Sequence, residues 1–299
     1  MAYQRVVVSL LGLMGLLPSL DPPLPAQDRK PAAKLYNTAK QRLMEGKQIV
    51  GGTVGTSDPE IYCAVANAGF DYIWIDMQHS TLTYEEAAKM IAACPRALAV
   101  PFIRVPDATE SEIQKATDIG ALGIIVPTVE TLEKARAAVR WTKYPPMGRR
   151  SEGQGVPAVS MWGRRDPTAL RGNDYRPTFN DNVMVVLMIE TPEGVKIADE
   201  IASVPGVDVV FAASGDLANF SGKPPGSPEY EALVTGIHDA TLKAGKKLGG
   251  PFAWKDRPGF TFFQGPGFGA LVRAGAPAVL GNLGNPPKPN ASVSGRVPE

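Results

Sequence analysis

The sequence predicts a (β/α)8 barrel, an α/β fold in which eight parallel strands alternate with helices. Short, continuously apolar runs are typical of strands buried on both faces of a parallel sheet. Helical stretches separate these runs, and 299 residues suffice for one barrel-sized domain. The eight strand-like runs are 49–56, 72–75, 98–105, 122–126, 183–189, 207–213, 247–252 and 278–280.

Helix signals fall between these runs. Ser57-Asp58-Pro59-Glu60 places a capping residue and a first-turn proline ahead of a helix that stops at Gly69. The segment 131–144 has acidic residues early and basic residues late, as the helix dipole favours. The expected helices are 28–47, 61–68, 84–93, 109–120, 131–144, 192–203, 228–244 and 267–274, with a long loop over 145–180.

A doubly wound open sheet is the alternative fold. It requires a glycine fingerprint between an early strand and the following helix. The sequence Gly51-Gly52-Thr53-Val54-Gly55 lies within the first predicted strand and matches that fingerprint poorly. The barrel is therefore the preferred prediction.

The two ends of the chain differ in composition from its middle. Arg5, the apolar stretch 6–17 and the small residue Ala26 are typical of a secretory signal over 1–27. We therefore expect an exported protein, periplasmic or secreted, with one barrel domain over 28–284 and a proline-rich, disordered tail over 285–299. An uncleaved anchor or a wrongly assigned start, with a cytoplasmic protein, remains the alternative.

The near-balanced charge of the chain argues against nucleic acids and anionic membranes as partners. A net charge of +1 gives no electrostatic reason to expect nucleic acid or an anionic membrane as a partner.

Export would permit a disulfide between Cys63 and Cys94, but the sequence does not show that the two residues lie within reach of each other. Buried free thiols are therefore the expectation.

Polar side chains follow the strand predicted over 72–75. Asp76, Gln78 and His79 come directly after this apolar run, where α/β barrels carry their chemistry. Arg104 ends the next strand and is suited to binding an oxyanion. The alternative for His79 is a local hydrogen bond that caps the following helix.

Two carboxylates follow later strands. Glu190 and Asp216 each come after an apolar strand, and without a lysine beside them they would repel each other unless a cation lay between them. Hard divalent ions such as Mg²⁺ or Mn²⁺ suit such an all-oxygen site. Glu130 is interpreted as a helix-start charge and His238 as a surface residue.

A set of motifs runs along the chain in a fixed order. Together they resemble the HpcH/HpaI aldolase family, and the resemblance covers roughly 45–280. The motifs are Gly69-Phe70-Asp71, Ile75-Asp76-Met77-Gln78-His79, Arg104, Asp118-Ile119-Gly120, Val126-Pro127, Tyr144-Pro145-Pro146-Met147-Gly148, Ile189-Glu190-Thr191 and Gly215-Asp216-Leu217.

The resemblance implies a barrel of the phosphoenolpyruvate/pyruvate-binding type and a class II aldolase. Such enzymes cleave 4-hydroxy-2-oxo acids, including 2-keto-3-deoxy sugar acids, to pyruvate and an aldehyde through an enolate held by a divalent metal (Mg²⁺, Mn²⁺ or Co²⁺). It implies that Glu190 and Asp216 bind the metal and that Arg104 holds the pyruvate oxygen. His79 would be the catalytic acid/base, with Asp118 as its partner. The partner molecule is a small 2-oxo acid.

The sequence departs from the family pattern at three substrate-binding positions. Gln78 replaces a glutamate, Met188 replaces a glutamine, and the proline usual near the aspartate is absent from Ala213-Ser214-Gly215. A non-catalytic carboxylate-binding barrel therefore stays as an alternative. A CoA-ester lyase on the same barrel is a second alternative, ranked lower because no basic, glycine-rich stretch marks a CoA site. Family members carry a final helix that packs on a neighbouring subunit, whereas this chain is polar and proline-rich after Leu283. A homo-oligomer is left open, but not through that exchange.

Overall fold

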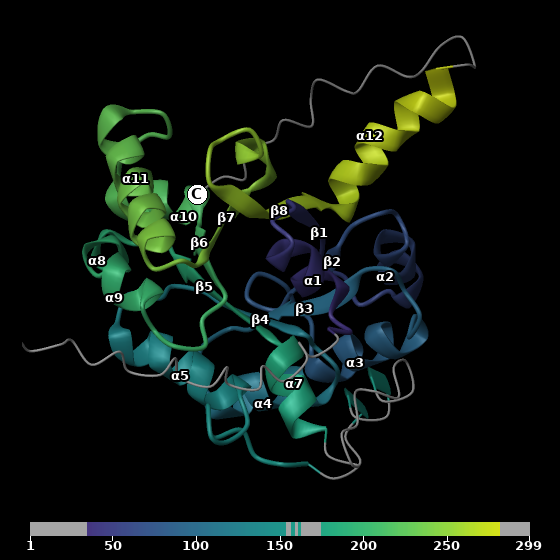
Figure 1. Ribbon diagram of the computed structural model, residues 1–299. Coiled ribbons are helices and arrows are strands. Elements are labelled where there is room, and N and C mark those ends of the chain that lie inside the picture. Colours follow the sequence, from purple (N-terminus) through teal and green to yellow (C-terminus); the bar gives the residue numbers. More distant parts are fainter. Residues whose placement is uncertain (1–34, 154–156, 159–160, 163–174, 282–299) are drawn as a thin grey trace, which may run out of the picture. The chain divides into compact units, whose positions relative to one another are not determined.

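Eight parallel strands form a closed barrel in the computed structural model, which describes residues 35–153, 157–158, 161–162 and 175–281 (Figure 1). Each strand pairs with the next along the chain, and the last pairs with the first. The predicted fold class is confirmed. The strands are β1 (Ile49–Val54), β2 (Tyr72–Asp76), β3 (Val100–Arg104), β4 (Gly123–Val126), β5 (Met184–Ile189), β6 (Val209–Ala212), β7 (Lys247–Pro251) and β8 (Phe260–Gly267).

Helices follow the strands around the barrel. The hydroxyls of Thr83, Thr109 and Thr131 accept first-turn N–H groups, and so fix where three helices begin. No helix within the described ranges is both long and apolar enough to cross a membrane. The helices are α1 (Thr38–Met44), α2 (Pro59–Ala66), α3 (Tyr84–Ala93), α4 (Glu110–Asp118), α5 (Leu132–Thr142), α7 (Arg176–Asn182), α8 (Pro192–Lys196), α9 (Ala198–Ala202), α10 (Ser214–Ser221), α11 (Pro228–Lys243) and α12 (Phe268–Leu280), with the 3-10 turn η2 (Phe252–Trp254).

The sequence misplaced the eighth strand. The run 278–280 belongs to α12, and the strand that closes the barrel is β8. Three apolar residues have no periodicity that separates a strand from a helix. The true strand was missed because its second half, Gln264-Gly265-Pro266-Gly267, has the composition of a turn.

Three other expectations differ from the structure or fall outside it. The end of the predicted 145–180 loop is helical, because α7 begins at Arg176. The predicted helix over 192–203 is divided at Ile197 into α8 and α9. The predicted signal, the tail over 285–299 and the first part of the 28–47 helix lie outside the described residues.

Strand side chains alternate between the interior of the barrel and the helix layer. On β2, Tyr72 and Trp74 belong to the inner cluster, the buried apolar residues inside the barrel. Ile73 and Ile75 belong to the outer cluster, the buried apolar residues between the strands and the helices. Aromatic rings fill the inner cluster because glycine on neighbouring strands makes room for them: a Cβ on Gly51 would lie 2.2 Å from the Tyr72 ring. The interior is therefore a packed core that supports whatever lies at its rim.

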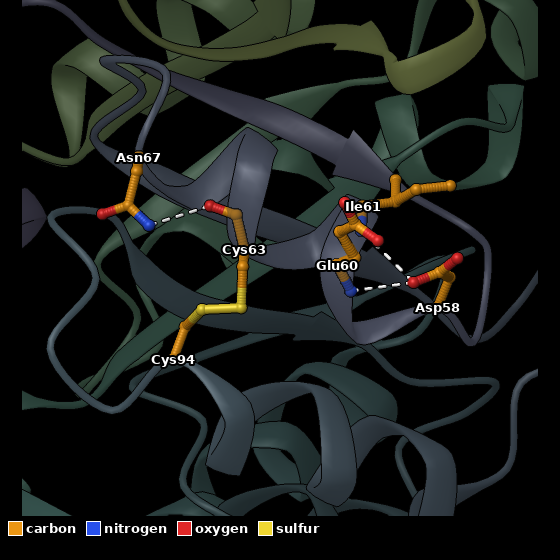
Figure 2. Close-up of a disulfide and its surroundings, with 6 residues drawn as sticks. All are labelled: Asp58, Glu60, Ile61, Cys63, Asn67 and Cys94. Carbon is orange, nitrogen blue, oxygen red and sulfur yellow. Dashed lines mark hydrogen bonds between the residues drawn. A yellow bond between two sulfur atoms is a disulfide. The ribbon is translucent and has the colours of Figure 1, made fainter.

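Cys63 of α2 and Cys94, directly after α3, form a disulfide (Figure 2). The expectation of two free thiols was therefore wrong. Their Cα atoms are 5.7 Å apart, within the usual range for a disulfide. Only the packing of α2 beside α3 brings together two residues that are 31 positions apart in sequence. The bond closes a loop that contains β2 and His79.

The disulfide is expected to stabilise the fold. Cross-linking a loop of this length removes chain entropy from the unfolded state worth about 3–4 kcal/mol. Cys63→Ser/Cys94→Ser should lower the free energy of unfolding by about that amount in urea melts. A reducing agent should destabilise the wild type similarly and leave the double variant unchanged. Equal stability of the two oxidised proteins would contradict this prediction.

Candidate active site

Strand alternation directs three charged side chains toward the axis at the carboxyl end of the barrel. Asp76 follows the inward-facing Trp74 by two residues, and Glu190 follows the inward-facing Met188 by two residues. Arg104 follows Phe102 in the same way on β3. These carboxyl ends are where α/β barrels hold their active sites.

Asp76 and Arg104 form a buried ion pair. They lie opposite each other in the register of β2 with β3. The Arg104 Nε donates to Asp76 Oδ1 at 3.0 Å, and Nη2 donates to Oδ2. Burial acts to raise the pKa of Asp76, but the hydrogen bonds and charge of Arg104 outweigh it and hold that pKa below its usual value. Among the described residues Arg104 Nη1 has no hydrogen-bond partner, so it is available to a ligand.

Asp76 also holds the loop that follows β2. Its Oδ1 accepts the backbone N–H groups of Gln78 at 3.1 Å and His79 at 3.2 Å. This confirms that Asp76 supports the loop, but the sequence reasoning missed its bond to Arg104. The signal was present, since both residues end neighbouring strands. The His79 side chain is exposed, and the Gln78 Oε1 is buried with no hydrogen-bond partner within the described ranges.

Glu190 and Asp216 form the acidic side of the rim. Glu190 is 1% exposed, and its Oε1 has no hydrogen-bond partner among the described residues. Burial, followed by the charge of Asp216, raises the pKa of Glu190 to about 7. The two carboxylates thus repel each other, as the sequence analysis expected of this pair.

A divalent cation fits this pair of carboxylates. Its charge would relieve their repulsion, and Glu190 Oε1 is a buried oxygen that needs a partner. No group of three or more potential metal-ligating side chains occurs among the described residues. Two carboxylates with the remaining positions left to water and substrate is an arrangement typical of Mg²⁺.

Ser214 is the first residue of α10, next to the acidic pair. Ala213, the N-cap of this helix, makes no side-chain hydrogen bond to the first turn. The backbone N–H groups at Ser214 and Gly215 are therefore not capped by a side chain, and a Cβ at Gly215 would meet nothing within 4 Å. Such a helix start favours a negatively charged group.

Met188 lies deeper than the other predicted substrate-binding residues. It is 2% exposed and belongs to the inner cluster with Trp74 and Phe211. Its side chain is thus part of the packed floor beneath Glu190. Trp74 also lies there, with its ring centroid 5.4 Å from the Arg104 Cζ.

The structure does not bring Asp118 to His79. Asp118 is the last residue of α4, which runs back toward the amino end of the barrel before β4 begins. There it pairs with Arg150 at 2.6 Å and accepts hydrogen bonds from the Gln114 side chain. Its predicted partnership with His79 therefore does not form within this chain. The signal was present in the sequence, because Asp118 falls near the end of the predicted 109–120 helix, just before the next strand, and in a β/α barrel that end of a helix lies away from the rim.

Glu130 and His238 lie where the sequence analysis placed them, at a helix start and on a surface helix. Glu130 is exposed and stands just before Thr131, the N-cap of α5. His238 lies on α11, with its side chain 27% exposed and its Nδ1 2.7 Å from Asp239 Oδ1. Neither residue belongs to the site.

Comparison with known proteins identifies the family. The HpcH/HpaI aldolase/citrate lyase family matches residues 54–251. This chain belongs to that family. A 2-keto-3-deoxy-L-rhamnonate aldolase of Escherichia coli O17:K52:H18 (strain UMN026 / ExPEC) is 30% identical over 219 residues, which are 73% of this chain and 79% of the relative.

Solved structures agree with this assignment. The HpcH/HpaI aldolase from Desulfitobacterium hafniense DCB-2 has a TM-score of 0.71 at 26% identity, covering 84% of this chain and 98% of that structure. A HpcH/HpaI aldolase/citrate lyase family protein from Burkholderia cenocepacia J2315 has a TM-score of 0.72 at 27% identity, covering 83% and 100%. The HpcH/HpaI chain described here is accordingly an enzyme of the carbon–carbon lyase class.

In this HpcH/HpaI barrel, Glu190 should destabilise the metal-free fold above neutral pH. Its folded pKa of about 7 exceeds its ordinary value of 4.5, so its stabilising contribution is present at low pH and is lost as pH rises from 4.5 through 7. Metal-free Glu190→Gln should therefore exceed the wild type in stability by about 3 kcal/mol at pH 8 and by little at pH 4.5.

Urea melts in EDTA across that pH range test this expectation. Glu130→Gln, at an exposed carboxylate on the same rim, is the matched control and should leave the pH profile unchanged. Parallel profiles for wild type and Glu190→Gln would contradict the prediction.

Proposed function

We propose that this chain is a divalent-metal-dependent aldolase that cleaves a 4-hydroxy-2-oxo acid to pyruvate and an aldehyde. The observation that carries the proposal is the unpartnered oxygen of Glu190, held beside Asp216 on the rim that also carries Arg104. The name of the Escherichia coli relative supports a 2-keto-3-deoxy sugar acid as one member of the substrate class.

Glu190 and Asp216 are the residues that would hold the metal, as Mg²⁺, Mn²⁺ or Co²⁺. When bound, such an ion withdraws electrons from a coordinated carbonyl oxygen and favours the enolate form of pyruvate. Protonation of Glu190 competes with metal binding, because its pKa lies near 7. Metal affinity should therefore weaken as pH falls below neutrality.

The remaining groups bind the substrate and move its proton. Arg104 Nη1 donates a charge-assisted hydrogen bond to the 2-oxo oxygen, and Asp76 keeps the guanidinium in place for this contact. The acid's carboxylate binds at the start of α10, where the N-cap leaves the N–H groups of Ser214 and Gly215 without a side-chain cap. The exposed His79 takes the proton of the 4-hydroxyl group, directly or through one water.

The bond changes then balance. As the O–H proton leaves, the C3–C4 bond breaks and C4 becomes the carbonyl carbon of the aldehyde. The electron pair of that bond passes to the 2-oxo group as an enolate, where Arg104 stabilises the negative charge. The proton that His79 took from the hydroxyl group, delivered to C3 directly or through water, then gives pyruvate.

Pyruvate release from a panel of 4-hydroxy-2-oxo acids tests the proposal. With Mg²⁺, Mn²⁺ or Co²⁺ the protein should release pyruvate, and EDTA should abolish the release. Pyruvate and metal binding without turnover would favour the alternative of a non-catalytic carboxylate-binding barrel, and turnover of CoA esters alone would favour the CoA-ester lyase.

Variants separate the roles of the residues in the same assay. Glu190→Ala and Arg104→Ala should each reduce turnover by several orders of magnitude, since each removes charge stabilisation at the enolate. Arg104→Ala also leaves Asp76 buried and unpaired, so its fold is verified by circular dichroism. Glu130→Ala is the control. Full activity of either site variant would overturn the assignment.

A homo-oligomer is a further part of this proposal. The apolar helix α12 has no buried residue, and Val272 and Val279 are 65% and 73% exposed. It runs away from the barrel instead of along it (Figure 1). This helix precedes the polar tail, so the composition of the tail does not argue against exchange of a helix between copies.

Light scattering during gel filtration tests the role of α12. The wild type should exceed the mass of 31.8 kDa expected for one chain. Val272→Glu/Val279→Glu should shift it toward that mass, because charge on an apolar contact face is costly to bury. Arg273→Glu, at a polar position on the same helix, should have little effect. A wild-type monomer would rule out the oligomer.

Export also remains a proposal, with one more observation in its favour. The Cys63–Cys94 disulfide forms and persists most readily in an oxidising compartment. Together with the apolar segment 6–17, it supports a periplasmic or secreted enzyme.

A further inference from the structure

Trp74 lies directly beneath the ion pair in which Asp76 orients the guanidinium of Arg104. It is the middle residue of β2, is fully buried, and precedes Asp76 by two positions on the inner face. Its ring makes an edge contact with Phe211 of β6 at 5.4 Å. Since β6 stands opposite β2 in the closed barrel, Trp74 spans the lumen and forms the floor of the site.

Two features of Trp74 are not explained by packing. Its ring lies 5.4 Å from the Arg104 Cζ, a cation–π distance. Its indole Nε1 is buried and has no hydrogen-bond partner in the part of the chain that the structure describes. A buried donor without a partner is unfavourable and is rare in native proteins. An apolar residue of similar size would fill the floor without that cost.

We propose that Trp74 is a second ligand-binding group of this site. Its ring holds the guanidinium of Arg104, which Asp76 holds by hydrogen bonds, and its indole N–H donates to an oxygen of the bound 2-oxo acid. The inference rests on the proposed function, because it takes a 2-oxo acid as the ligand. It also gives the floor of the site a polar group that selects for a ligand oxygen.

Two substitutions separate the ring from the N–H. Trp74→Phe keeps an aromatic face for Arg104 and removes the indole N–H, whereas Trp74→Leu removes both. Losing one hydrogen bond should weaken pyruvate binding about five- to ten-fold in Trp74→Phe. Loss of the cation–π contact should weaken it by roughly a further five-fold in Trp74→Leu.

The matched control is Trp254→Phe. Trp254 also stacks on an arginine, with the Arg257 Cζ 4.4 Å from its ring, but it belongs to the outer cluster. The same substitution there should leave pyruvate binding unchanged. A general effect of losing a tryptophan–arginine contact would instead appear in both proteins.

Calorimetric titration with Mn²⁺, and then with pyruvate in the presence of Mn²⁺, tests the inference. The expected result is an unchanged Mn²⁺ Kd in all variants and a graded rise in the pyruvate Kd in the two Trp74 variants. Folded Trp74→Phe that binds pyruvate as the wild type does would overturn the role of the N–H, even if Trp74→Leu does not fold. A wild type that binds Mn²⁺ but no pyruvate would instead overturn the proposed function, and this inference with it.

Discussion

The buried ion pair between Asp76 and Arg104 is the interaction on which the rest of the site depends. The register of β2 with β3 places the two residues opposite each other, and closure of the barrel removes both from water. In that environment neither charge is tolerable without the other. Asp76 Oδ1 also accepts hydrogen bonds from the backbone N–H groups of Gln78 and His79. One carboxylate thus fixes both the Arg104 side chain and the loop that carries His79.

The opposite side of the rim is built on an unfavourable interaction. Glu190 is buried beside Asp216, and its raised pKa reflects both the burial and the repulsion. A protein gains nothing in metal-free stability from such a pair. The same features leave an oxygen that the divalent cation of the proposed function would neutralise, and such a loss of stability is common where a site serves binding. The rim therefore combines one charge pair that is satisfied with one pair of like charges that is not.

The helix layer contributes in a different way. The disulfide joins Cys63 of α2 to Cys94, directly after α3 (Figure 2). The stretch between the two cysteines carries β2 and the His79 loop. The disulfide acts on the unfolded chain, whereas the ion pair acts on the folded site. At the far end of the chain, α12 leaves an apolar face uncovered, which a second copy of the chain could bury.

The sequence by itself determined the barrel and which residues stand at the ends of its strands. Continuous apolar runs identify buried parallel strands, and the polar residues that follow them, such as His79, Arg104 and Glu190, must lie on one rim. These are local properties, readable from period and composition. The eighth strand was predicted at the wrong place, because the second half of β8, Gln264-Gly265-Pro266-Gly267, has the composition of a turn.

Only the tertiary structure decided which residues meet. It paired Cys63 with Cys94, set Asp76 against Arg104, and placed Trp74 beneath them. Each of these contacts depends on strand register or on helix packing. Those quantities are fixed by closure of the whole barrel, so no local stretch of sequence contains them.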